Sequence, residues 1–331
     1  MERNYKPTVA LIYGGRGCES DVSVRGAEQI MPLIDREKYK TLSVFIDKDG
    51  RWFCNGGEAT LAFIEGVSGL VIRGEMNAVD CAIPLLHGDF GEDGVVQGAL
   101  ENAKIRYVGC EVTAGAVCAD KALTKMVARA LGIPTLPSIT VTSESKALLA
   151  EKALGYPMFV KPCSLGSSVG TARVVNRDEL LSAARAALKL DRCVLIESYI
   201  SHPRELECAY FGANCKEMFT NPGEIICRGD FYDYERKYFS TEDVSVLPEA
   251  DIGADIKEKI KEYSALLVHT IGVRDLCRVD FFLKGEELYF NEINTMPGFT
   301  PDSLYPEMLK NAGIQPRELI GLLIEGALMR D

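Results

Sequence analysis

The chain lacks several features that would assign it to a common class of protein. Its 331 residues contain no uninterrupted apolar run of about 18 residues, so we expect no membrane span. The first seven residues lead directly into an apolar, β-rich run without the apolar core of a signal peptide. The eleven cysteines include no C-x-x-C pair, so neither a zinc site nor a disulfide framework is indicated. These absences predict a cytoplasmic protein with reduced thiols.

Positive charge is also scarce. The formal net charge of −11 argues against general nucleic-acid binding, which requires a basic face. A nucleotide is still compatible with this charge where lysines and arginines gather locally. We therefore expect neither a nucleic-acid partner nor a membrane partner.

The length exceeds what one hydrophobic core usually covers, which predicts two or three domains. The opening third alternates strand and helix patterns, with strands expected at 8–13, 40–46 and 79–86 and a helix at 22–33. This alternation predicts an α/β domain with a doubly wound parallel sheet, whose function lies at the carboxyl ends of the strands. Polar clusters at 14–20 and 87–94 follow two of these strands. The glycine spacing of the first is not G-x-G-x-x-G, which disfavours a nicotinamide-binding oxidoreductase.

A second unit begins after Cys110, with a helix that starts at Asp120-Lys121. A glycine- and serine-rich loop, 163–170, then lies between strands expected at 156–162 and 171–175. This is not a Walker A loop, which leads into a helix, but its N–H groups and hydroxyls could surround phosphates. Lys161 lies on the strand before the loop. It either snorkels from an apolar run or contacts a phosphate.

The strand expected at 193–200 leads into a polar segment. Glu197, with the backbone of Ser198 and Ile200, could read the edge of an adenine, and Glu205 could accept from ribose hydroxyls. The aromatic and charged segment 229–238 lacks periodicity and is interpreted as a long functional loop.

Two strands near the C-terminus, 276–283 and 288–294, carry polar residues on one face and are joined by a polar turn, which predicts a hairpin. Arg278 shares a face with Asp280, as Glu292 does with Asn294. Buried neighbouring carboxylates need a cation, and an all-oxygen set of Asp280, Glu292 and Asn294 suits Mg²⁺. The structural alternative is an internal salt bridge to Arg278.

These pieces occur in an order that resembles the D-alanine–D-alanine ligases of the ATP-grasp superfamily, from Gly14 to the C-terminus. The motifs that carry the resemblance are Gly14-Gly15 with Glu19 and Val22-Ser23; His87-Gly88 with Gly91-Glu92-Asp93-Gly94 and Gln97-Gly98; Asp120-Lys121; Lys161-Pro162 with Gly166-Ser167-Ser168-Val169-Gly170; Tyr232-Asp233-Tyr234-Glu235 with Lys237-Tyr238; Arg278-Val279-Asp280; and Glu292-Ile293-Asn294-Thr295 with Pro297-Gly298 and Ser303-Leu304.

The resemblance implies a fold and a reaction. An N-terminal α/β domain of the pre-ATP-grasp type (1–115) would precede a central ATP-grasp lobe (116–205) and a C-terminal lobe with the metal site (206–331). ATP would phosphorylate one D-alanine, and the amine of a second would attack the acylphosphate to give D-alanyl-D-alanine for peptidoglycan synthesis. Two Mg²⁺ ions, with Mn²⁺ as a substitute, and a homodimer are also implied.

The resemblance further assigns roles to single residues. The catalytic group would be Glu19, Ser167, Arg278 and Ser303. The substrates would contact these four together with His87, Glu92, Tyr238 and Leu304. ATP would contact Lys121, Lys161, Ser168, Glu197, Ser198, Ile200, Glu205, Lys237 and Asn291, and the metal ligands would be Asp280, Glu292 and Asn294.

Three alternatives remain beside D-alanine at both positions. D-serine-using relatives have arginine where Leu304 stands, and D-lactate-using relatives replace the region of Tyr238, so both substrates are disfavoured. A catalytically silent ATP-binding sensor would have lost a metal ligand or the arginine, and none is lost here.

Overall fold

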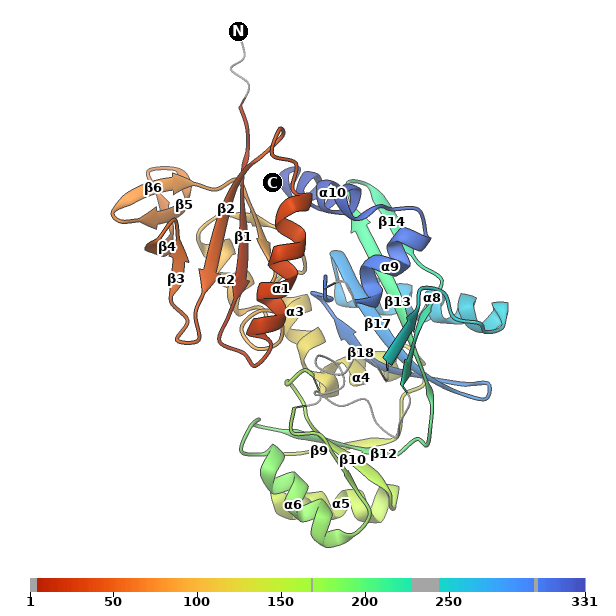
Figure 1. Cartoon of the computed structure of the whole chain (residues 1–331). Helices are drawn as coiled ribbons and strands as arrows, with labels where there is room; N and C mark the ends of the chain where they lie inside the picture. The colour runs from red at the N-terminus through yellow and green to blue at the C-terminus, as the bar shows by residue number, and fades with distance from the viewer. Residues whose placement is uncertain (1–4, 168, 228–243, 301–302, 331) are drawn as a thin grey trace.

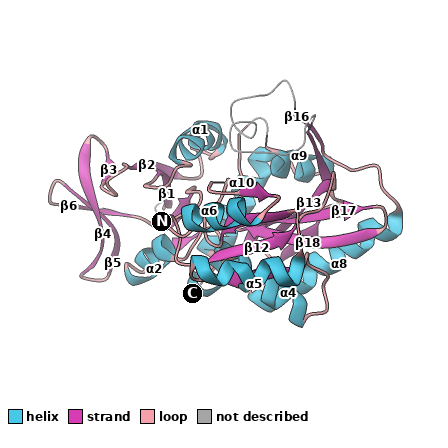
Figure 2. Cartoon of the chain, turned by 90° about the horizontal axis from the view of Figure 1, so that it is seen from below, coloured by secondary structure: helices cyan, strands magenta, loops and turns pink. Residues whose placement is uncertain are grey.

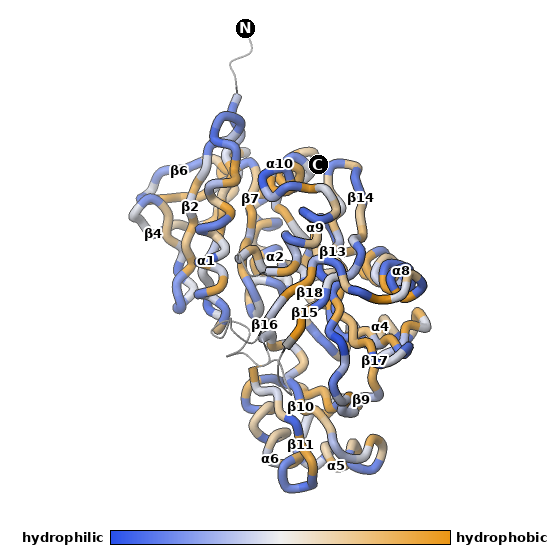
Figure 3. Tube along the Cα trace, turned by 45° about the vertical axis from the view of Figure 1, so that its right-hand side comes forward, coloured by the Kyte–Doolittle hydropathy of each residue, from blue (hydrophilic) through white to orange (hydrophobic). Residues whose placement is uncertain are grey.

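The structure is a computed structural model that describes residues 5–167, 169–227, 244–300 and 303–330. Three β-sheets organise these residues, each with helices packed against it (Figure 1). Apolar residues concentrate along the strands, whereas the connecting turns are mostly hydrophilic (Figure 3). Within the described ranges, no helix is both long enough and apolar enough to cross a membrane.

The first sheet has eight strands in the order β6-β5-β4-β3-β2-β1-β7-β8. Its strands are β1 (Thr8–Gly14), β2 (Lys40–Ile46), β3 (Trp52–Cys54), β4 (Gly57–Ile64), β5 (Val67–Ile72), β6 (Glu75–Ala78), β7 (Cys81–Pro84) and β8 (Arg106–Tyr107). Parallel pairing joins β2, β1, β7 and β8, as the alternating pattern predicts. The strands β2 to β6 instead pair antiparallel, a meander that the sequence pattern did not predict.

Helices cover both faces of the parallel part of this sheet. Among them are α1 (Ser20–Ile30), extended by the 3₁₀ turn η1 (Met31–Leu33), and α2 (Val95–Asn102). Val9 and Leu11 of β1 belong to the same core cluster as residues of α1, whereas Ala10 and Ile12 cluster with α2. Alternate side chains of one strand therefore serve two cores, and α1 and α2 lie on opposite sides of the sheet (Figure 2).

The second sheet is antiparallel, in the order β11-β10-β12-β9. It consists of β9 (Ser138–Val141), β10 (Met158–Pro162), β11 (Ala172–Val174) and β12 (Val194–Ser198), and it packs against α5 (Glu144–Leu154) and α6 (Arg177–Ala187). Val160 and Ile196 belong to the core under these helices. The alternation along the strands consequently places Lys161 and Glu197 on the opposite face.

The third sheet has the order β16-β15-β13-β17-β18, with β14 paired to β13. Its strands are β13 (Arg204–Ala213), β14 (Lys216–Phe219), β15 (Gly223–Cys227), β16 (Val244–Leu247), β17 (Asp275–Lys284) and β18 (Glu287–Asn294). Around it pack α3 (Val112–Ala119), α4 (Lys121–Ala130), α8 (Ala254–Ile271), α9 (Leu304–Asn311) and α10 (Pro316–Leu328). The expected hairpin is confirmed as β17–β18.

Candidate active site

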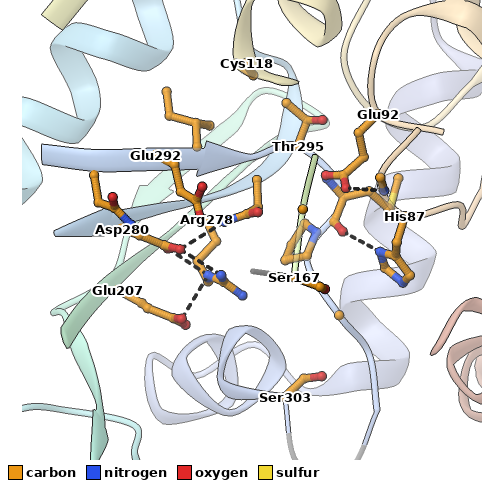
Figure 4. A pocket seen from close by; sticks show the side chains of 18 of the residues that line it. His87, Glu92, Cys118, Ser167, Glu207, Arg278, Asp280, Glu292, Thr295 and Ser303 are labelled. Carbon is orange, nitrogen blue, oxygen red and sulfur yellow. Dashed lines mark hydrogen bonds and ion pairs between the residues drawn. The ribbon is translucent and has the colours of Figure 1, made fainter. Parts of the chain in front are cut away.

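A cavity of about 370 Å³ opens where loops of the first sheet meet the loop after β10 and the strands β13, β17 and β18. It brings together thirteen of the residues predicted from the sequence: Glu19, His87, Glu92, Lys121, Ser167, Glu205, Arg278, Asp280, Asn291, Glu292, Asn294, Ser303 and Leu304. Figure 4 shows several of them converging on one space. Lys161, Glu197, Ser198 and Ile200 do not line this cavity. Ser168, Lys237, Tyr238 and the segment 229–238 lie outside the described residues.

A row of three carboxylates crosses the floor of the cavity. Glu207 on β13 lies directly opposite Asp280 on β17, which in turn lies opposite Glu292 on β18. Like charges placed opposite one another on neighbouring strands repel, so the row requires cations. Glu207 was not predicted as a site residue, because only the pairing of β13 with β17 brings it to Asp280.

Arg278 supplies one of the required cations. Its Nε and Nη2 donate to the two oxygens of Asp280 at 2.8 and 2.7 Å, and Nε also lies 3.1 Å from Glu207 Oε1 (Figure 4). Burial by itself would lower the pKa of Arg278, but Asp280 and Glu207 offset this and hold the pKa well above its ordinary value. The salt bridge considered from the sequence is therefore present, within the same group of residues as the candidate metal ligands.

Lys121 supplies a second cation, from the first turn of α4. Its Nζ lies 3.2 Å from Glu292 Oε2 and donates to the carbonyl of Leu165 at 2.8 Å. The side chain of Asp120 caps this helix by accepting from the N–H groups of residues 122 and 123. Lys121 thereby connects the helix, the glycine- and serine-rich loop and the hairpin at one point.

The donor set at the floor fits a hard divalent cation. Asp280 and Glu292 provide carboxylate oxygens. The amide nitrogen of Asn294 donates to Asp280 Oδ2 at 3.0 Å, so this nitrogen, and not the amide oxygen, faces the carboxylate. Such oxygen ligands are those that Mg²⁺ takes in proteins. Among the described residues, no group of three or more His, Cys, Asp or Glu side chains could hold a metal ion, and the predicted ligand set includes the amide of Asn294 instead.

The loop after β10 closes over Glu19. The hydroxyl of Ser167 donates to Glu19 Oε1, and Ser167 itself has a left-handed backbone with φ of 49°. Gly88 and Gly166 lie against the same carboxylate, since a Cβ at either position would come within 2.7 or 2.8 Å of Glu19 Oε2. A side chain at either position would push this carboxylate aside, so the two glycines leave room for it.

His87 and Glu92 attach the loop after β7 to the segment that follows β18. Nδ1 of His87 donates to the carbonyl of Met296 at 2.9 Å, which fixes the tautomer of the ring. Glu92 accepts from the N–H groups of Gly88 and Met296, both at 2.9 Å (Figure 4). Burial raises the pKa of Glu92. The hydrogen bonds of His87 and Glu92 to Met296 thus hold the two parts of the cavity wall together.

Ser303 is the N-cap residue of α9, Leu304 is its first residue, and both line the cavity. Ser303 Oγ accepts from the N–H of Thr300 at 3.1 Å and lies 2.9 Å from its hydroxyl. Leu304 is only 4% exposed and borders the cavity. This wall of the cavity is therefore apolar at the position of Leu304.

Lys161 and Glu197 form a separate buried group beside the cavity. Lys161 Nζ lies 2.8 Å from Glu197 Oε2, and Lys125 Nζ lies 2.9 Å from Glu197 Oε1. Both lysines hold Glu197 as the anion and lower its pKa to about 2, although burial alone would raise it. The N–H of Ser198 donates to the carbonyl of Pro137 at 2.9 Å.

Lys125 was not predicted as a site residue. The available signal was its spacing from Lys121, because residues four apart lie on the same face of a helix. A lysine at this spacing is common on exposed helices, so only the burial of the side chain distinguishes it.

A cavity floored by antiparallel strands and covered by a glycine- and serine-rich loop, beside an N-terminal α/β domain, defines the class of nucleotide-dependent ligases with the ATP-grasp fold. The family models described as D-ala D-ala ligase N-terminus and D-ala D-ala ligase C-terminus match residues 8–110 and 127–325. The chain belongs to the D-alanine–D-alanine ligase family.

Individual relatives agree with this family. The chain is 39% identical to a D-alanine–D-alanine ligase of Chlorobium luteolum, with 97% of each chain covered. Its identity to the corresponding ligase of Solibacter usitatus is 40%, over 98% of this chain and 96% of the relative. Among solved structures, D-alanyl-alanine synthetase A of Vibrio cholerae matches with a TM-score of 0.90 and 32% identity, over 98% and 99% of the two chains. The VanG D-Ala:D-Ser ligase of Enterococcus faecalis matches with a TM-score of 0.88 and 30% identity, over 97% and 99%.

Proposed function

We propose that the protein is an ATP-dependent ligase that joins two D-alanine molecules through a D-alanyl phosphate, for peptidoglycan precursor synthesis. The observation that carries this proposal is the meeting of two kinds of site in one cavity. The carboxylate row with its arginine and lysine suits phosphate and metal, and the Glu19–Ser167 pair suits an amino acid. Phosphoryl transfer to a carboxylate requires both sites to adjoin.

The first D-alanine would bind with its ammonium group at Glu19, and Ser167 would hold the carboxylate of Glu19 in place. Arg278 would neutralise the oxyanion of the tetrahedral intermediate, for which its permanently charged, hydrogen-bonded guanidinium is suited. His87 and Glu92 would shape the wall between the two substrates.

ATP would lie between the second and third sheets. Lys121 and Lys161 would contact its phosphates, Glu205 and Asn291 would border the nucleotide, and Glu197 with the backbone at Ser198 and Ile200 would adjoin the base. Ser168, Lys237 and Tyr238 complete the proposed set on the strength of the family resemblance alone.

Two Mg²⁺ ions, held by Asp280, Glu292 and Asn294, would neutralise charge on the transferring phosphoryl group. Mn²⁺, which also favours oxygen ligands, would substitute for them. The carboxylate row supports this assignment because Asp280 and Glu292, opposite each other on the hairpin, offer the charged oxygen ligands that a divalent cation favours.

The second substrate is proposed to be D-alanine. The alternative, D-serine, is raised by the structural match to a D-Ala:D-Ser ligase. Leu304 argues against it, because an apolar side chain offers no partner to an added hydroxyl. D-lactate is less favoured still. A silent ATP-binding sensor is disfavoured because the arginine and the metal ligands all line the cavity.

The proposal is tested by phosphate release from purified protein. Release should require ATP, Mg²⁺ and D-alanine together, and omission of any one should abolish it. Offered with D-alanine at two pH values, D-serine and D-lactate should react less than a second D-alanine. Absence of release with every amino acid would leave the sensor as the explanation, and preferred incorporation of D-serine would replace the proposed second substrate.

We also propose that residues 1–115, 116–205 and 206–331 are the three structural units. One sheet lies in each, apart from the first two residues of β13, which supports the division. A homodimer formed through the N-terminal unit, acting in the cytoplasm where ATP is available, is proposed from the resemblance and can be checked by light scattering.

A further inference from the structure

Lys125 is a fully buried lysine near the proposed nucleotide site. It projects from α4 one turn after Lys121 and is 1% exposed. Lysine is almost never buried to this degree unless it is paired. Its Nζ lies 2.9 Å from Glu197 Oε1 and 3.4 Å from the carbonyl oxygen of Phe290. Burial lowers the pKa of Lys125, and Glu197 opposes that effect.

Glu197 is shared between two lysines of different exposure. Lys125 occupies Oε1, and Lys161 lies 2.8 Å from Oε2. The side chain of Lys161 is 14% exposed, whereas that of Glu197 is 1% exposed. Lys161 and Glu197 lie diagonally across the β10–β12 pair, on the face turned away from α5 and α6. Of the three side chains, Lys161 is therefore the one with the most exposed surface for a ligand.

The charges of this group leave one positive unit. One carboxylate balances one of the two lysines, so the group of Lys125, Glu197 and Lys161 carries a net charge of +1. Without Lys125 the remaining pair is neutral, and both oxygens of Glu197 would compete for Lys161. If Glu197 paired with Lys161 alone, its negative charge would cancel the attraction of Lys161 for a phosphate. When Glu197 is shared with Lys125, Lys161 attracts the phosphate more strongly.

We propose that Lys125 is a positioning residue for ATP: it holds one oxygen of Glu197, so that Lys161 keeps its direction and its net positive charge for the nucleotide phosphates. This inference rests on the proposed function, since it presupposes that ATP binds beside Lys161. Lys125 does not touch the nucleotide in this arrangement. It acts through Glu197 on Lys161.

The test is a cycle of substitutions read by the dissociation constant of ATP·Mg²⁺ in calorimetry. Lys125→Met keeps most of the aliphatic stem and removes the charge. It should weaken ATP binding by roughly tenfold or more, the effect of losing one hydrogen-bonded charge. The KM for D-alanine should change by less than about twofold, because Lys125 lies outside the cavity. Lys257→Met is the matched control, since Lys257 pairs with Glu249 at 2.6 Å away from this group, and it should bind ATP like the wild type.

The same change in a Glu197→Gln background distinguishes positioning from packing. With no carboxylate to share, the added Lys125→Met should cost less than about twofold in ATP affinity. An equal loss in both backgrounds would assign Lys125 a purely structural role and overturn the inference, as would ATP binding by Lys125→Met within twofold of wild type. If the wild type itself bound no ATP, the proposed function would fail instead. Melting temperatures of the wild type and its four variants, the Lys257→Met control included, show whether each variant is folded.

Discussion

Glu292 is a proposed metal ligand and also pairs with Lys121, a proposed phosphate-binding residue. It lies across the hairpin from Asp280 and within 3.2 Å of Lys121 Nζ. A neutral amide of the same shape at this position would keep the packing but remove a charged oxygen ligand. A single side chain can therefore be tested for catalysis with little effect on the fold.

We expect Glu292→Gln to lower kcat by roughly a hundredfold to a thousandfold, the range for loss of one charged group acting in the transition state. The melting temperature should change little, because Glu292 is partly exposed. Phosphate-release kinetics and circular dichroism measure the two quantities. Glu286→Gln, at the exposed hairpin turn, is the control and should retain full activity. A fully active Glu292→Gln would remove Glu292 from the metal ligands.

Single residues also show the limit of prediction from the sequence. Arg278, Asp280, Glu292 and Asn294 could be found because neighbours two apart on a strand share a face, which is a local rule. Glu207 and Lys125 could not, because their roles depend on contacts with strands distant in the sequence. The sequence predicted the side chain of Glu197 next to an adenine, and this role is still to be tested. The pairing of Glu197 with two lysines was not predicted.

At the scale of an element, α4 carries two lysines of the site, the partly buried Lys121 and the buried Lys125, and the side chain of Asp120 caps its start. Asp120 Oδ1 accepts from the N–H groups of Ala122 and Leu123 at 2.9 and 3.1 Å. The cap fixes the first turn of the helix, from which Lys121 extends toward Glu292. The position of the Lys121 ammonium group in the site thus depends on the N-terminal cap of α4.

Asp120→Ala should lower the free energy of unfolding by about 1 kcal/mol, the usual cost of a lost N-cap. The KM for ATP should rise as the first turn loosens around Lys121. Asp120→Asn retains the capping oxygen and should lose only a few tenths of a kcal/mol. Urea denaturation of the two variants separates these effects. Equal destabilisation by both would mean that the charge of Asp120, not its hydrogen bonds, stabilises the helix.

At the scale of the whole molecule, the C-terminus ties the first sheet to the third. Arg330 donates through Nη2 to Asp275 and through Nη1 to the carbonyl of Tyr107, the latter at 2.8 Å. Asp275 Oδ2 accepts from the N–H of Gly109 at 2.6 Å. Burial raises the pKa of Asp275, and Arg330 opposes this shift. Removal of the arginine would leave a buried carboxylate without its cation.

Arg330→Met should therefore lower the free energy of unfolding by about 3 kcal/mol, the lower end of the cost of breaking a buried ion pair. Chemical denaturation at neutral pH measures the change. Arg317→Met is the comparison, because Arg317 is exposed and its oxygen partner on Asp35 is 3.9 Å away, and it should have almost no effect. If the two variants were equally stable, this contact would not hold the sheets together.

The sequence by itself determined the parallel part of the first sheet, the β17–β18 hairpin and the family resemblance, because strand alternation, turn residues and ordered motifs are written locally along the chain. Only the tertiary structure decided the antiparallel meander, the carboxylate row and the sharing of Glu197 between Lys125 and Lys161. The physical reason is the distance along the chain over which each feature is decided. A side chain's face follows from its nearest neighbours, whereas its charge partner follows from which strand or helix packs beside it, and that is settled by the burial of the whole core.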